Sequence, residues 1–107
     1  LFQFCTILLI IILFFTGITL QHKTWQYSLT KGIQNLEQND LRQAEIEFEN
    51  GLKKNPRSAL LYFYLGYIHY QQGNKEEAID YFQKALELDP NDATTHQFLQ
   101  EIQGTSQ

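Results

Sequence analysis

The sequence predicts an all-α protein: a helix–turn–helix repeat that forms a short α-solenoid, preceded by a single transmembrane helix. Two observations support this fold class. The first twenty residues of the 107 contain no charged side chain, and the rest of the chain repeats itself at a fixed spacing. All 8 basic and 12 acidic residues follow position 22, so the formal charge of −4 belongs to an ordinary, mildly acidic domain.

The segment 1–20, "LFQFCTILLIIILFFTGITL", is predicted to be a transmembrane helix that contacts the lipid bilayer. A helix of about 20 apolar residues matches a hydrocarbon core of roughly 30 Å. A cleaved signal peptide is the main alternative, but it requires basic residues before the run and a small-residue cleavage site. A buried core helix is disfavoured because the remaining chain is too small to surround it.

The flanks of this segment predict its orientation. Residues 21–24 form a juxtamembrane linker, followed by Trp25 and Tyr27, two aromatic residues suited to headgroup depth. Lys23 and Lys31 follow the span and no basic residue precedes it. The positive-inside tendency therefore predicts a single-pass protein whose soluble part lies on the cytoplasmic (or stromal) side.

Five landmark residues recur with one spacing in the rest of the chain. The pairs are Gly32 and Gly66, Asn39 and Gly73, Ala44 and Ala78, Phe48 and Phe82, and Pro56 and Pro90. Each pair differs by 34, since 66 − 32 = 34 and 90 − 56 = 34. A fixed period of this length indicates stacked copies of one supersecondary unit.

The period and its residue types resemble the tetratricopeptide repeat (TPR), a helix–turn–helix unit. Residues 59–92 match the family pattern along their whole length, with Tyr62, Leu65, Gly66, Ala78, Phe82, Ala85 and Pro90 at signature positions. Residues 25–58 match less closely, through Gly32, Ala44, Phe48 and Pro56. The resemblance implies one degenerate repeat, one full repeat, and a C-terminal capping helix and tail over 93–107.

Local signals place the helix boundaries at the same points. Asp40 with Gln43, and Asn74 with Glu77, read as N-caps with capping-box partners. Pro56 and Pro90 follow helical stretches that they cannot continue. The expected helices are near 25–38, 41–54, 59–72, 75–88 and 93–104. Phe98, Leu99 and Ile102 on the last helix are expected to cover the end of the stack.

The stretch "YFYLGYIHY" carries two stripes of side chains at helical spacing. Tyr62, Leu65, Gly66 and His69 are expected to pack against the partner helix. The second stripe consists of Phe63, Tyr67 and Tyr70. It occupies positions that line the concave peptide-binding groove of TPR domains, where aromatic side chains are typical binding anchors. The candidate groove residues are Leu29, Ile33, Leu36, Phe63, Tyr64, Tyr67 and Tyr70. Internal packing or self-association is the alternative reading of this surface.

The residues in this groove exclude one type of TPR ligand site. TPR domains that clamp the acidic C-termini of chaperones use Lys, Asn and Arg there. The matching positions hold Leu29, Ile33, Phe63, Tyr67 and Phe98, so no carboxylate clamp is predicted. The combination of an N-terminal membrane helix and a few repeats also resembles the photosystem I assembly factors of cyanobacteria and plastids.

Catalysis, metal binding and nucleic-acid binding find no support in the sequence. His22, His69 and His96 have no metal-ligand partner at suitable spacing, and there is no phosphate loop or nucleophile motif. The chain also lacks a basic stripe. We therefore predict a protein without a cofactor or enzymatic activity, which recruits or positions a protein or peptide partner at a membrane. A homo-oligomeric scaffold is the alternative.

Overall fold

The computed structural model describes residues 2–104, apart from the side chains of 18–23 within the first helix. His22 and Lys23 of the predicted membrane flank are among those side chains. The described chain forms five helices: α1 Phe2–Glu37, α2 Leu41–Lys54, α3 Ala59–Gln71, α4 Lys75–Leu88 and α5 Ala93–Gly104. The all-α, helix–turn–helix solenoid is thus confirmed, and the ends of α2, α4 and α5 fall at the expected residues.

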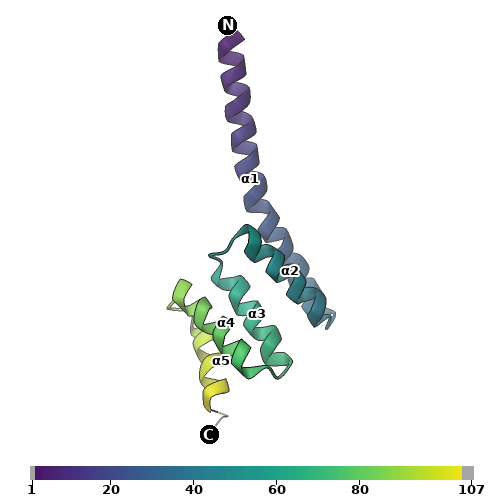
Figure 1. Cartoon of the computed structure of the whole chain (residues 1–107), viewed down its shortest axis with the longest axis vertical. Helices are drawn as coiled ribbons and strands as arrows, with labels where there is room; N and C mark the ends of the chain where they lie inside the picture. The colour runs from purple at the N-terminus through teal and green to yellow at the C-terminus, as the bar shows by residue number, and fades with distance from the viewer. Residues whose placement is uncertain (1, 105–107) are drawn as a thin grey trace.

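Helix α1 is longer than the sequence suggested, because it continues through the expected linker at 21–24 without a break. Its N-terminal half extends beyond the other helices and reaches one end of the molecule (Figure 1). The large apolar side chains of this half, from Phe2 to Phe15, are all more than half exposed.

The transmembrane helix predicted over residues 1–20 is not borne out by the structure. No helix in the described part of the chain combines the length and the hydropathy that a membrane crossing requires.

Close helix packing within each repeat depends on one glycine facing one phenylalanine. A Cβ atom added at Gly32 on α1 would lie 2.3 Å from the ring of Phe48 on α2. In the second unit, a Cβ at Gly66 on α3 would lie 2.7 Å from the ring of Phe82 on α4. These are the two pairs that the repeat spacing had aligned, so the same close approach recurs 34 residues later.

Two clusters of buried side chains form the core, one around each repeated phenylalanine. Phe48 lies in the first cluster with Leu61, Leu65 and Ile68 of α3, so the core joins the two units. Phe82 lies in the second cluster with Ala78 and Ile102. Phe98 and Leu99 of α5 pack against this second cluster. Helix α5 therefore covers Phe82 with the three residues that the sequence analysis named.

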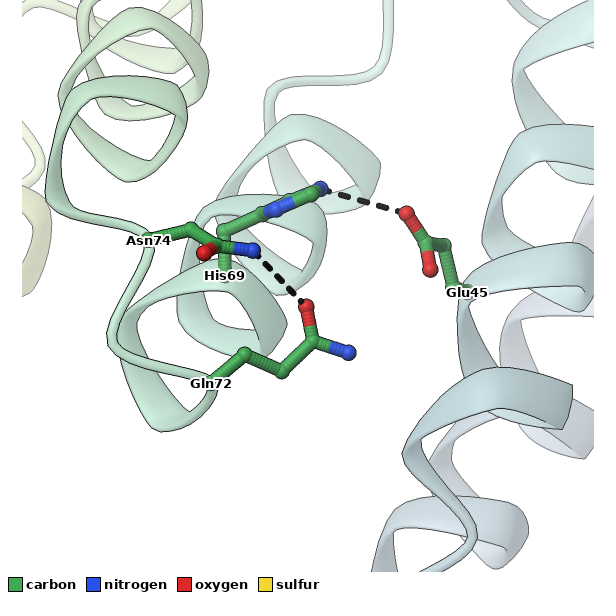
Figure 2. Close-up of polar contacts among 4 residues, drawn as sticks. All are labelled: Glu45, His69, Gln72 and Asn74. Carbon is green, nitrogen blue, oxygen red and sulfur yellow. Dashed lines mark hydrogen bonds and ion pairs between the residues drawn. The ribbon is translucent and has the colours of Figure 1, made fainter.

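The helix starts are only partly as predicted. The Asp40 carboxylate accepts a hydrogen bond from the Gln43 backbone N–H at 3.1 Å, as an N-cap should. Asn74 also stands at the N-cap position of α4, as predicted, but its side chain makes no cap hydrogen bond. Its Nδ2 instead donates to Gln72 Oε1 at 3.4 Å, which turns the side chain away from the helix start (Figure 2).

Candidate functional site

A surface pocket lies between the C-terminal end of α1, the start of α2 and α3. Its volume is about 360 Å³. The lining residues are Ile33, Leu36, Glu37, Asn39, Leu41, Tyr64, Tyr67 and Gln71. The volume is at the lower end of the range for ligand pockets, roughly 300–1,000 Å³, and suits one large side chain of a partner.

The pocket combines an apolar wall with a polar rim. Ile33, Leu36 and Leu41 pack against the first core cluster, so the wall is held by the interior of the domain. Tyr64 stacks on the buried ring of Phe48, with centroids 5.0 Å apart and planes at 10°. This stacking fixes the ring at the pocket wall before any ligand arrives, which lowers the entropy cost of binding.

The turn between α1 and α2 closes one side of the pocket. Asn39 has a φ of 59°, in the left-handed region, and Gly73 takes the equivalent place in the second unit with a φ of 80°. Asn39 therefore adopts the left-handed conformation that glycine adopts in the second unit, and it adds an amide side chain to the rim of the pocket. Gln71 and Glu37 supply the other polar groups.

Four of the seven residues predicted for the groove line this pocket, namely Ile33, Leu36, Tyr64 and Tyr67. The others lie elsewhere. Leu29 packs against the first core cluster, while Phe63 and Tyr70 pack against the second. Glu37, Asn39, Leu41 and Gln71 line the pocket but were not predicted. Glu37, Asn39 and Leu41 lie in or next to the first interhelical turn, and Gln71 lies at the end of α3 next to the second; these positions were the available signal.

Tyr70 joins α3 to the capping helix. Its hydroxyl donates a hydrogen bond to Glu101 Oε1 at 3.1 Å, and its ring meets that of Phe98 edge-on at 5.5 Å. The hydrogen bond and the negative charge of Glu101 raise the pKa of the Tyr70 hydroxyl above its ordinary value. Tyr67 also touches Phe98, with ring centroids 5.9 Å apart.

The repeat spacing explains why a pocket forms in the first unit. Leu36 and Tyr70 are equivalent, since 36 + 34 = 70, and Tyr67 and Glu101 are equivalent, since 67 + 34 = 101. In the second unit the tyrosine spans the distance to the next helix through its hydrogen bond. In the first unit the shorter Leu36 cannot do so, and the space beside Tyr67 stays open.

His69 lies at the junction of three helices rather than only between α3 and α4. Its Nε2 is 3.2 Å from Glu45 Oε1 on α2, as Figure 2 shows. Its ring stacks on Tyr81 of α4, with centroids 5.3 Å apart. Burial, followed by the charges of Glu49 and Glu45, raises the pKa of Tyr81. Nothing in the sequence paired residues 45 and 69.

The predicted signature residues occupy structural positions. Gly32, Ala44, Phe48, Leu65, Gly66, Ala78, Phe82 and Ala85 are buried. Tyr62 is half-buried and its ring lies 6.4 Å from that of Tyr81. Pro56 and Pro90 lie in the turns that follow α2 and α4.

No enzymatic or metal site is indicated by the described residues. Within residues 2–104, no group of three His, Cys, Asp or Glu side chains could hold a metal ion. The His96 Nε2 atom lies 2.8 Å from the Pro90 carbonyl oxygen, which gives this histidine a local role at the start of α5.

Comparison with known proteins agrees with this geometry. The model of the family described as "Tetratricopeptide repeat" matches residues 29–93, more than half of the chain. No curated protein sequence matches the chain. Among solved structures, the complex of the TPR2B domain of yeast Sti1 with pHsp70 is similar, with a TM-score of 0.74 and 20% sequence identity. That match covers 78% of this chain and 67% of the other, and at this identity it shows the fold. The chain belongs to the tetratricopeptide repeat family.

Proposed function

We propose that this TPR protein binds a segment of a partner protein in the pocket between α1 and α3 and positions that partner without catalysing a reaction. One observation carries the proposal: the pocket is open and apolar in the first unit, while a tyrosine spans the equivalent place in the second. Large apolar contacts at the centre of an interface supply most of its binding energy. Tyr67 and Tyr64 are suited to this role because each combines a large ring with a polar hydroxyl.

A second part of the proposal concerns α1. The residues from Phe2 to Phe15 expose apolar side chains around the helix. Exposed apolar surface of this extent is typical of contact with a lipid or a protein. We favour contact with a lipid membrane. The TPR domain would then bind its partner on the cytoplasmic or stromal side of that membrane. Confinement to a membrane would raise the effective concentration of both proteins.

Flotation of the full chain with phosphatidylcholine vesicles tests the membrane part. The wild-type chain should float with the vesicles, and a variant with Leu9→Lys and Leu13→Lys should remain in the dense fraction. If neither protein floats but both form the same concentration-dependent oligomer, the apolar half of α1 does not serve as a lipid anchor. If only the wild type oligomerises, α1 mediates a homo-oligomeric scaffold instead.

Photo-crosslinking in the native cell tests the partner-binding part. A photoreactive amino acid at Tyr67 should yield an adduct with a different protein, because this side chain lines the pocket. The same amino acid at Lys53, exposed on α2, serves as the matched control and should not yield that adduct. Adducts with the same chain alone, or equal adducts from both positions, would contradict the proposal.

A further inference from the structure

The charges around the pocket indicate the chemistry of its ligand. Among the described residues that line it, Glu37 alone carries a charge, and this residue is exposed at the rim. We propose that the pocket takes a large apolar side chain that is followed by a lysine or arginine, with the basic group placed beside Glu37. This inference rests on the proposed function and specifies the partner class.

The distribution of basic residues supports the same ligand. The first helix of each unit and the capping helix contribute the groove side of a TPR domain, here α1, α3 and α5. After Lys31, the described residues of these three helices include two charged side chains of the Lys, Arg, Asp and Glu types. Both are acidic, namely Glu37 and Glu101. The lysines and arginines that follow Lys31 lie on α2, on α4 and in the turn that joins α2 to α3.

Lys31 does not compensate for Glu37. With about 100° between successive residues of an α-helix, Lys31 lies roughly 160° from Ile33 around α1. Its ammonium group also lies over the ring of Tyr27, 5.8 Å from the centroid. Among the described residues that line the pocket, the charge therefore remains that of Glu37, and an acidic ligand would be repelled there.

Three peptides test this specificity with the purified full chain in detergent solution. They are fluorescent eight-residue peptides with the central pairs Phe–Lys, Phe–Gln and Phe–Glu in an otherwise uncharged sequence. The Phe–Lys peptide should bind about two- to fivefold more tightly than the Phe–Gln peptide, the gain that an exposed ion pair supplies. The Phe–Glu peptide should bind the most weakly, and added salt should reduce the differences.

Two matched variants assign the effect to the rim. Glu37→Gln should make the three affinities equal, whereas Glu76→Gln, at an exposed position on α4, should preserve the ranking. Leu36→Tyr, which copies the second unit, should weaken the binding of all three peptides.

The outcomes separate this inference from the proposed function. If Leu36→Tyr weakens all three peptides but their affinities are equal, the pocket binds partners and the inferred preference is wrong. If Leu36→Tyr has no effect on any peptide, both proposals fail. If no peptide binds and Leu36→Tyr abolishes self-association of the chain, the occupant is a second copy and the inference is overturned.

Discussion

His69 Nε2 lies 3.2 Å from Glu45 Oε1, and this contact links the second unit to the first. The same histidine ring stacks on Tyr81, so one side chain joins α2, α3 and α4. Its Nδ1 atom is buried and has no hydrogen-bond partner among the described residues. An unpaired buried polar atom costs stability, which offsets part of what the contact with Glu45 and the ring stack contribute.

Substitutions of His69 and Glu45 should separate the contribution of the ring stack from that of the contact between the two side chains. The two side chains are 14% and 27% exposed, so Glu45→Gln should lower the free energy of unfolding by at most about 1 kcal/mol. His69→Phe keeps an aromatic ring against Tyr81 and removes the unpaired nitrogen. It should therefore lower the free energy of unfolding by less than His69→Ala does. Urea unfolding followed by circular dichroism measures the three values. Equal costs for His69→Phe and His69→Ala would mean that the ring stack contributes little.

The two interhelical glycines should not tolerate a methyl group. Gly32→Ala and Gly66→Ala each place a Cβ less than 3 Å from a buried phenylalanine ring. Overpacking of this kind costs about 1–3 kcal/mol, which exceeds the gain of up to about 1 kcal/mol from the better helix propensity of alanine. Both variants should therefore unfold at lower urea concentration than the wild-type chain.

Gly17→Ala is the control for these two variants. A Cβ at Gly17 meets no atom of the described residues within 4 Å, so only the propensity gain remains and stability should be unchanged or slightly higher. A loss of stability in Gly17→Ala equal to that in Gly32→Ala would show that close packing is not the cause.

Alkaline pH should destabilise the domain through two tyrosines. The pKa values of Tyr70 and Tyr81 are raised above the ordinary 10.0 in the folded state. The folded chain therefore holds these protons more tightly than the unfolded chain does. The resulting stabilisation is fully present below pH 10 and is lost as the pH rises through the folded pKa values.

Tyr70→Phe and Tyr81→Phe check this assignment by urea unfolding between pH 8 and pH 11. Each variant should lose less stability over this range than the wild-type chain. Identical pH profiles for all three proteins would contradict the role of Tyr70 and Tyr81.

Much of the fold could be read from the sequence because the repeat fixes it redundantly. Gly32 with Phe48 and Gly66 with Phe82 carry the same packing twice, and the turns between them hold proline, glycine or asparagine. The continuation of α1 through residues 21–24 could not be foreseen. These residues include no proline or glycine that would end a helix, but nothing in them requires the helix to continue either. The Asn74 N-cap position was also readable, but the contact of its side-chain Nδ2 with Gln72 was not.

The candidate site was predicted less well than the fold. The helical stripe identified Tyr67, but periodicity gives only the side of a helix on which a residue lies. Whether that side faces solvent or another helix depends on the neighbour, and Phe98 covers Phe63 and Tyr70 in this protein. The opening beside Leu36 depends on the length of one side chain relative to Tyr70 in the next unit, which only the structure makes visible.

The most direct test of the central claim is photo-crosslinking from Tyr67 in the native cell with and without Leu36→Tyr. Circular dichroism and thermal unfolding should first establish that the variant is folded. We expect the adduct with the partner protein to be lost in the variant, because the introduced ring fills the space beside Tyr67. An adduct of unchanged yield in the folded variant would mean that the partner does not occupy the pocket, and the proposed function would be wrong.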